Sequence, residues 1–173
     1  MAVDSQDRIV LAGIFSTVTP ASSHQATVLR YTSSLQADAS FGTAGKATYA
    51  FLSAPGATSC PTGGSGTGCN VGGVAIQADD KIVVGGYRNA FTALAVARVN
   101  VDGTLDTTFG SSGVEYLTIS GFTLYDNGSI DLDEDDGIWI TGGAYQAGYS
   151  NRKTLLALLT PNGALDTSFG STP

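Results

Sequence analysis

The chain has 173 residues, of which 42% are hydrophobic, only 13% are charged and 23 are glycine. A chain of this length supports one domain that buries roughly 70% of the surface of its unfolded state. Abundant glycine and scarce charge favour many short strands joined by tight turns, and they argue against a helical bundle. With 15 acidic and 8 basic residues the net charge is −7, which excludes nucleic acids and anionic membrane surfaces as expected partners.

A short motif occurs three times and divides the chain into repeats. Each copy ends in Phe-Gly, and an aspartate stands three residues before the phenylalanine: Asp38 and Phe41, Asp106 and Phe109, and Asp166 and Phe169. An apolar segment that starts at an aspartate precedes each copy, at residues 7–13, 80–86 and 136–142. The phenylalanines lie about 60–70 residues apart, a period that suits a propeller blade or a solenoid unit. We predict a single repeat domain over residues 1–173, with repeats at 2–73, 74–129 and 130–173.

Alternating apolar residues predict short strands in every repeat. In chain order the strands are 2–3, 9–11, 27–31 and 46–51 in the first repeat, 74–77, 82–87, 94–100 and 113–119 in the second, and 130–133, 138–141 and 155–160 in the third. Four antiparallel strands make one propeller blade. The predicted fold is therefore all-β, with three four-stranded antiparallel propeller-like blades, the last lacking its final strand, and with eleven strands in total.

The recurrence of the motif in every repeat indicates a structural role, because a catalytic group is needed once and a fold-forming group in each blade. We expect the large phenylalanine rings to fill the seams between neighbouring blades. Each motif aspartate is expected to accept hydrogen bonds from the backbone N–H groups that follow it, as in an Asx turn.

These segments resemble the bacterial delta-60 repeat family, whose hallmark is a hairpin of the kind Asp-Gly-Lys-Ile-Val-Val-x-Gly followed by Gly-x-Leu-Asp-x-x-Phe-Gly. Residues 80–86, 103–110 and 163–170 match this pattern closely, whereas residues 33–38 of the first repeat depart from the Gly-x-Leu spacing. The paired glycines that close the second strand are also similar to those of kelch blades. The resemblance covers essentially the whole chain and implies a secreted or surface-attached bacterial propeller with no established activity.

Two cysteines, Cys60 and Cys69, lie in a loop made almost entirely of glycine, serine and threonine. We interpret them as a disulfide, which contributes roughly 2–3 kcal/mol in the chain-entropy model. Two free surface thiols are the alternative, and a metal site would need two more ligands that are not nearby. Because a disulfide implies an oxidising compartment, we expect an extracellular, cell-surface or periplasmic location. We expect no transmembrane span or signal peptide within the chain, so any export signal lies outside it.

The densest group of charges is the acidic segment 131–137. Its alternating Asp131, Asp133 and Asp135 could wrap a hard cation such as Ca²⁺. The segment does not match an EF-hand loop, because Asp136 stands where that loop has its glycine. The alternative is that these acids form the same hairpin turn as the corresponding residues of the other two repeats. No other cofactor is expected.

Aromatic residues give a second candidate binding site. Tyr145 and Tyr149, with Trp139 nearby, could form a platform for a carbohydrate or a peptide in a longer loop after a strand. The alternative is that Trp139 belongs to the core and that the tyrosines pack at its edge. The single histidine, His24, is interpreted as a solvated residue in a loop between strands, and not as part of a metal site or a catalytic triad.

These observations favour a non-enzymatic, extracellular β-propeller-type binding or scaffold module. The alternatives are a self-assembling structural subunit and a propeller glycoside hydrolase, which would need paired carboxylates such as Glu115, Asp126 or Asp131 that nothing in the sequence pairs. Three blades do not close a ring of the usual size, and a missing strand leaves a sheet edge open. We therefore expect the chain to associate with itself or with a neighbouring propeller segment through its open blade edges.

Overall fold

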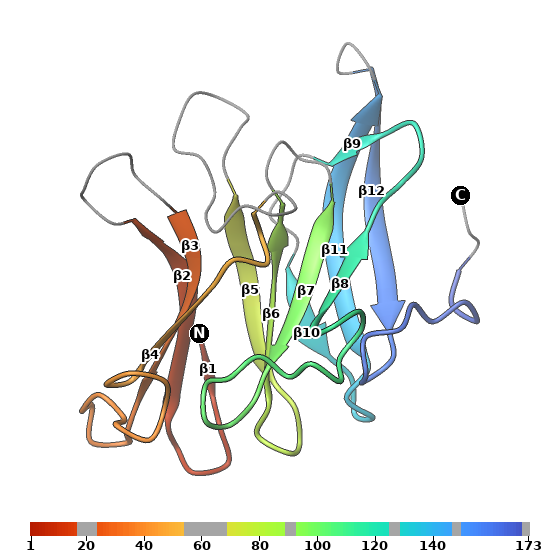
Figure 1. Cartoon of the computed structure of the whole chain (residues 1–173). Helices are drawn as coiled ribbons and strands as arrows, with labels where there is room; N and C mark the ends of the chain where they lie inside the picture. Colours follow the sequence, from red (N-terminus) through yellow and green to blue (C-terminus); the bar gives the residue numbers. More distant parts are fainter. Residues whose placement is uncertain (17–23, 54–68, 89–92, 125–128, 147–149, 171–173) are drawn as a thin grey trace.

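Three antiparallel sheets lie side by side in the computed structural model, which describes residues 1–16, 24–53, 69–88, 93–124, 129–146 and 150–170 (Figure 1). None of these residues forms a helix, so none of them belongs to a helix that could span a membrane. The all-β class predicted from composition is confirmed.

The first two sheets are complete four-stranded blades. Blade 1 contains β1 (Ala2–Val3), β2 (Ile9–Ser16), β3 (His24–Tyr31) and β4 (Lys46–Tyr49), paired in that order. Blade 2 repeats this order with β5 (Asn70–Ile76), β6 (Ile82–Tyr87), β7 (Leu94–Val99) and β8 (Val114–Leu117). The first hairpin of each blade turns at an aspartate with positive φ, 58° at Asp7 and 62° at Asp80. Aspartate adopts this conformation more readily than most residues because its side chain is short and polar.

Blade 3 is built differently. It contains β10 (Ile130–Leu132), β11 (Ile138–Gln146) and β12 (Ser150–Leu159), and the short strand β9 (Thr123–Leu124) pairs with β11 beyond the residues that pair with β10. The described residues thus form twelve strands, and the predicted total of eleven is wrong. β9 was missed because it has no counterpart that the repeat pattern marks, whereas the equally short β1 stands directly before the first aspartate hairpin. Among the described residues no strand pairs with the outer edge of β12, as predicted for a blade that lacks its final strand.

The sheets also shift the predicted repeat boundaries. β5 begins at Asn70 and pairs with β6 on both sides of a bulge, so residues 70–73 belong to blade 2. β9 precedes the predicted boundary at 129/130, yet it belongs to the sheet of blade 3. Composition could not place these boundaries, because the glycine-containing start of β5 differs little from the loop that precedes it.

Several strands extend further than predicted. β2 continues through Gly13, and β3 begins at His24, which pairs with Ser16, so His24 is not the loop residue expected from the sequence. β11 continues through Gly142, where a Cβ atom would lie 3.0 Å from Cδ1 of Leu94 in blade 2. Glycine at this position marks a close approach between blades, and not the end of a strand.

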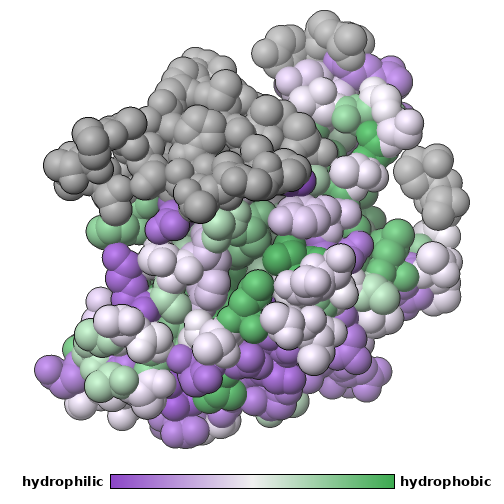
Figure 2. All heavy atoms as spheres, viewed as in Figure 1, coloured by the Kyte–Doolittle hydropathy of each residue, from purple (hydrophilic) through white to green (hydrophobic). Residues whose placement is uncertain are grey.

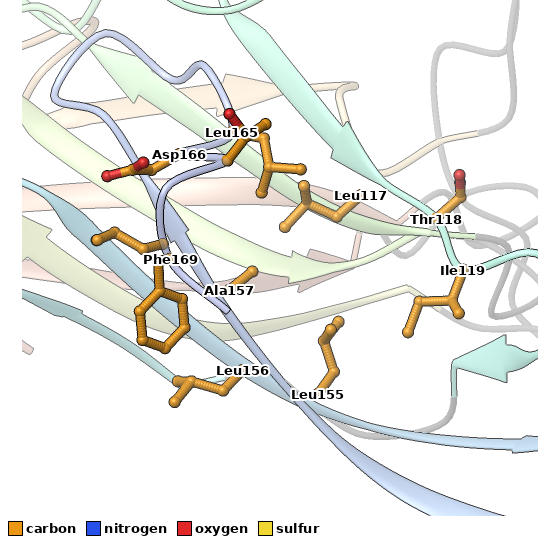
Figure 3. A pocket seen from close by; sticks show the side chains of 11 residues that line it. Leu117, Thr118, Ile119, Leu155, Leu156, Ala157, Leu165, Asp166 and Phe169 are labelled. Carbon is orange, nitrogen blue, oxygen red and sulfur yellow. The ribbon is translucent and has the colours of Figure 1, made fainter. Parts of the chain in front are cut away.

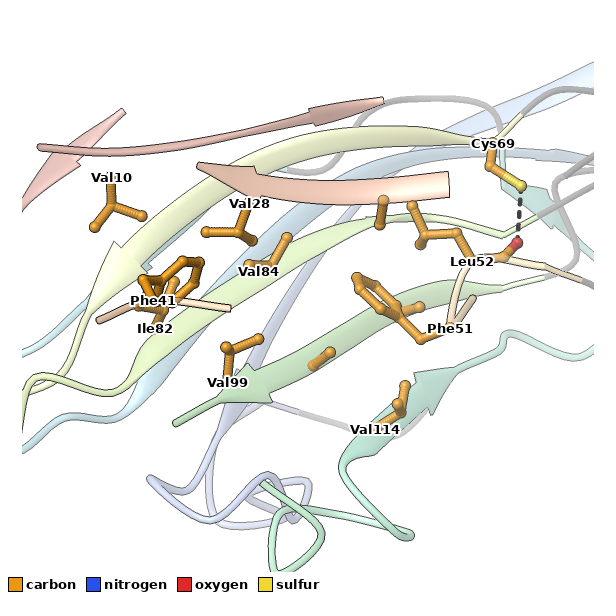
Figure 4. Packing of buried hydrophobic residues seen from close by; sticks show 13 residues of the cluster. Val10, Val28, Phe41, Phe51, Leu52, Cys69, Ile82, Val84, Val99 and Val114 are labelled. Carbon is orange, nitrogen blue, oxygen red and sulfur yellow. Dashed lines mark hydrogen bonds between the residues drawn. The ribbon is translucent and has the colours of Figure 1, made fainter. Parts of the chain in front are cut away.

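Two hydrophobic cores lie between the sheets. The first is shared by blades 1 and 2 and includes Val10, Val28 and Phe41 on one side and Ile82 and Val84 on the other (Figure 4). The second is shared by blades 2 and 3 and includes Leu94, Val96 and Phe109 on one side and Ile130 and Ile138 on the other. Because each core is shared, a blade buries its faces only against its neighbours, as in other repeat architectures.

Candidate functional site

The seams between blades show how one blade recognises the next. Phe41 and Phe109 are fully buried, and each ring packs under a glycine in a turn of the following blade, Gly103 for Phe41 and Gly163 for Phe109. Both glycines have positive φ, 90° and 87° respectively. The sequence predicts that the motif phenylalanines fill the seams, and at these two positions the rings lie between neighbouring blades.

These turns leave no room for a side chain. A Cβ atom on Gly103 would lie 2.8 Å from the backbone nitrogen of Gly42, and one on Gly163 would lie 2.7 Å from Cζ of Phe109. Either substitution would force the seam to move, because the neighbouring atoms are backbone or a packed ring. Glycine is therefore required by the approach of the preceding blade as well as by the backbone conformation.

A backbone hydrogen bond accompanies each of these contacts. The N–H of Gly42 donates to the carbonyl oxygen of Asp102 at 2.8 Å, and the N–H of Gly110 donates to that of Asn162 at 2.9 Å. Each donor is the glycine of a Phe-Gly motif, and each acceptor directly precedes the seam glycine. We call the Phe-Gly pair the plug and the turn that receives it the receiving turn.

An arginine from the third strand of blade 1 completes the first seam. Nε of Arg30 donates to Oδ2 of Asp38 at 2.8 Å, and its Nη1 donates to the carbonyl oxygen of Val101 in blade 2 at 2.6 Å. The guanidinium carbon also lies 4.7 Å from the centroid of the Phe41 ring. The arginine thus joins its own motif aspartate, the plug and the next blade.

The second seam repeats this arrangement. Nε of Arg98 donates to Oδ2 of Asp106 at 2.8 Å, Nη1 donates to the carbonyl oxygen of Pro161 at 2.7 Å, and the guanidinium lies 5.1 Å from the ring centroid of Phe109. Sequence reasoning missed both arginines. The signal was present as a separation of eight residues between arginine and motif aspartate in the first two repeats, whereas the third repeat has Leu158 at that position.

The motif aspartates form the predicted Asx turns in all three repeats. The residue two positions later donates its N–H to Oδ1 of the aspartate, at 3.0 Å from Ser40 to Asp38, 3.1 Å from Thr108 to Asp106 and 2.8 Å from Ser168 to Asp166. The hydroxyl groups of the same three residues donate to the same oxygen atoms at 2.6 Å.

These contacts lower the pKa values of the aspartates. At Asp38 the hydroxyl of Ser40 is the largest influence, and together with the Ser40 N–H and Arg30 it outweighs burial and holds the pKa below the usual range. At Asp106 burial alone would raise the pKa, but hydrogen bonds from Thr108 and the charge of Arg98 outweigh it and hold the pKa well below the usual range. Both carboxylates are therefore ionised throughout the physiological pH range.

A third inter-blade contact lies at the first hairpin of each blade. The N–H and the hydroxyl of Ser5 in blade 1 donate to the carboxylate of Asp80 in blade 2 at 2.9 and 2.6 Å. In the same way, the N–H of Ala78 in blade 2 donates to Oδ1 of Asp136 in blade 3 at 3.0 Å. Asp136, the last aspartate of the acidic segment, therefore has the same position and role as Asp80.

Of the remaining acids of that segment, Asp133 organises the hairpin turn and Asp131 lies in strand β10. Oδ1 of Asp133 accepts the N–H groups of Asp135 at 3.0 Å and Gly137 at 2.7 Å, and Oδ1 of Asp131 accepts the N–H of Leu132 at 2.9 Å. Within the described part of the chain, no group of three His, Cys, Asp or Glu residues is placed to hold a metal ion. The geometry thus favours the turn interpretation over the Ca²⁺ interpretation.

The outer face of blade 3 carries the same plug without a receiving turn. Phe169 is 39% exposed, although its counterparts are fully buried, and its ring meets the half-buried Trp139 edge-on at a centroid distance of 4.7 Å. Leu156 on β12 and Leu165 in the motif are also exposed. We call the surface formed by Trp139, Leu156, Leu165 and Phe169 the outer face.

A groove follows the open edge of β12 beside this face (Figure 3). Its walls include Leu117 and Ile119 of blade 2, Leu155 and Leu156 of β12, and Leu165 and Phe169 of the motif. In Figure 2, hydrophobic residues are visible over β12, whereas the end of the molecule that carries the hairpin turns is mostly hydrophilic. The groove and the outer face therefore form one largely apolar surface along β12, to which the last strand of blade 2 also contributes.

Several of the other predicted site residues lie outside the described residues. Tyr145 is half-buried on β11, and Tyr149 lies outside the described residues, as do Cys60 and Asp126. Glu115 on β8 and Asp131 on β10 belong to different blades. Cys69 is buried, and its Sγ lies 2.8 Å from the carbonyl oxygen of Leu52 (Figure 4). Because Cys60 lies outside the described residues, the Cys60–Cys69 disulfide stays a prediction.

Comparison with known proteins agrees with the architecture. Residues 77–109 and 134–169 match the model of a family described as a β-propeller domain of unknown function (DUF5122). Each match begins near the first hairpin turn of a blade and ends at the phenylalanine of its plug, and neither includes the first repeat. No curated protein and no solved structure gives a significant match to the chain. The matches support a propeller-like repeat fold and do not identify a ligand or an activity.

Proposed function

We propose that this chain is a non-enzymatic β-propeller-type scaffold module that binds another propeller segment through the outer face of blade 3. One observation carries the proposal: the plug residue that is fully buried at both internal seams is 39% exposed at Phe169. Exposed aromatic and aliphatic side chains that form a contiguous patch are typical of interaction surfaces.

The open edge of β12 supports a protein partner in preference to a small molecule. An edge strand presents backbone N–H and C=O groups that an added strand can pair with, and apolar pockets beside it receive the side chains of that strand. In blade 2, β8 occupies this position and pairs with β7 at Ala97, Val96, Ala95 and Leu94. A partner strand on β12 would complete blade 3 in the same way and would fill the groove of Figure 3.

An enzymatic function and a carbohydrate site have less support. Glycoside hydrolysis needs two facing carboxylates, and neither Glu115 on β8 nor Asp131 on β10 has a carboxylate partner in the motif or seam contacts described above. The resemblance to delta-60 repeats and the cysteine pair support an extracellular setting, which is part of the proposal. A screen for hydrolysis of diverse oligosaccharides tests the enzymatic alternative, and turnover of any sugar would overturn the non-enzymatic assignment.

The docking function is tested by supplying the missing blade within one chain. A second copy of residues 111–170, inserted after residue 170, would provide a strand like β8 for blade 3 and a fourth blade with its own receiving turn. We replace Trp139 by Phe in the inserted copy, because the protein has a single tryptophan and its emission then reports only on the outer face of blade 3.

We expect the emission of Trp139 to move to shorter wavelength and the thermal unfolding midpoint to rise by a few degrees or more. The matched control carries Gly163→Leu in the inserted copy alone, which blocks its receiving turn. An emission spectrum that does not change with the intact copy would overturn the proposed docking function.

A further inference from the structure

We infer that the outer face of blade 3 accepts a propeller blade whose receiving turn has glycine at the position of Gly103 and Gly163, here called the seam position. We also infer that Leu35, at the seam position of blade 1, prevents the chain's own first blade from binding there. The inference rests on the proposed function and names the partner that it requires. Head-to-tail stacking of identical copies is therefore not the mode of assembly, and the partner is a different blade.

Leu35 occupies the seam position of blade 1. Its N–H donates to the carbonyl oxygen of Thr32 at 2.9 Å, as the N–H of Gly103 does to Asn100 and that of Gly163 does to Thr160, both at 2.9 Å. The φ angle of Leu35 is 62°, positive like those of the two glycines. The three turns thus share one backbone conformation, and only the first has a side chain at this position.

That side chain lies where a plug would have to bind. At the internal seams even a Cβ atom would lie within 2.8 Å of the plug, at Gly42 in the first seam and at Phe109 in the second. A leucine adds three further carbon atoms beyond Cβ, and its side chain is 67% exposed in blade 1. Phe169 of a second copy therefore cannot approach this turn as Phe41 and Phe109 approach theirs.

The first hairpin of blade 1 has the same turn conformation as the hairpins that receive a preceding blade. Asp7 has the same positive φ as Asp80 and Asp136, which accept hydrogen bonds from the preceding blade. Leu35 is therefore the residue that distinguishes blade 1 from a receiving blade. A backbone with φ of 62° favours glycine over leucine, so leucine at this position is an unfavourable choice for local conformation.

The experiment uses the wild-type chain as donor and a variant of the same chain as receiver. The receiver carries Leu35→Gly, with Trp139→Phe and Phe169→Ala to remove its own outer face. The control receiver carries Trp139→Phe and Phe169→Ala but keeps Leu35. The backbone at position 35 suits glycine, and residues 139 and 169 are partly exposed, so both receivers are expected to fold, which circular dichroism checks.

We measure association by sedimentation velocity and by the emission of Trp139, which belongs to the donor alone in these mixtures. The expected result is a Kd at least about tenfold lower for the Leu35→Gly receiver than for the control receiver. A donor with Phe169→Ala should bind the Leu35→Gly receiver and the control receiver with similar Kd values. Equal binding to both receivers would overturn the role of Leu35 while leaving the docking function in place. Binding to neither receiver would contradict the docking function itself.

Discussion

Nε of Arg98 lies 2.8 Å from Oδ2 of Asp106, and both side chains are at least nine-tenths buried. The same guanidinium donates to the carbonyl oxygen of Pro161 in the next blade. One arginine therefore neutralises a buried carboxylate and joins two blades. Arg30 and Asp38 repeat the relationship at the first seam, whereas Leu158 and Asp166 do not.

Arg98→Ala is expected to lower the free energy of unfolding by about 3–5 kcal/mol, because it leaves Asp106 buried without its main partner. Lys81, whose Nζ lies 3.3 Å from Oδ2 of Asp106, places the effect toward the lower end of that range. Urea denaturation followed by circular dichroism measures the change. Arg152→Ala, at an exposed position on β12, is the control and should change stability by about 0.5 kcal/mol or less.

Phe109→Ala should lower the free energy of unfolding by about 3–5 kcal/mol, because it removes a fully buried ring from the second seam. Phe169→Ala, the same change in the third repeat, should cost about 1 kcal/mol or less, because its ring contacts Trp139 at an exposed face. Equal losses in chemical denaturation would show that a partner or a closed seam already covers Phe169.

Gly163→Ala should destabilise the protein by about 1–3 kcal/mol more than Gly170→Ala does. Both glycines have positive φ, 87° and 75°, so alanine strains the backbone at either position. Only at Gly163 would the new Cβ meet another group, the ring of Phe109, since nothing lies within 4 Å of that position at Gly170. A difference near zero between the two variants would mean that the receiving turn can shift to accommodate the new Cβ atom without loss of stability.

Acid should destabilise the protein from about pH 4 downward. Asp38 and Asp106 have pKa values below the usual range in the folded state, so each stabilises the fold above its unfolded pKa and loses that contribution as the pH falls toward its folded pKa. Unfolding by urea between about pH 5 and pH 2 measures the effect. Asp106→Asn should be less stable at neutral pH and less sensitive to acid, and identical pH profiles for variant and wild type would contradict the assignment.

The Cys60–Cys69 disulfide is tested by intact mass. Reduction should raise the mass by about 2 Da, one hydrogen for each sulfur, and should lower stability by roughly 2–3 kcal/mol. Alkylation of two thiols in the unreduced, unfolded protein would show that the cysteines are not joined.

The sequence alone determined most of the strands, the presence of three repeats and the Asx turns of the motif aspartates. Strand patterns, hairpin turns and Asx turns depend on contacts between residues close together in the chain, so periodicity and residue type are enough to identify them. The turn at Asp80 and the bonds from Thr108 to Asp106 are of this kind. The short strand β9 was not predicted because it lies at a position that the repeat pattern does not mark.

Only the tertiary structure decided what lies across each seam. Arg98 contacts Pro161, and Gly163 lies over Phe109, because two blades separated in sequence pack face to face. A local sequence pattern does not show which residues of two different blades come into contact. The same is true of Leu35, which in the sequence is one departure from a repeat. In the fold it stands where the next plug would bind, because the backbone at that position is the one that glycine adopts at both seams.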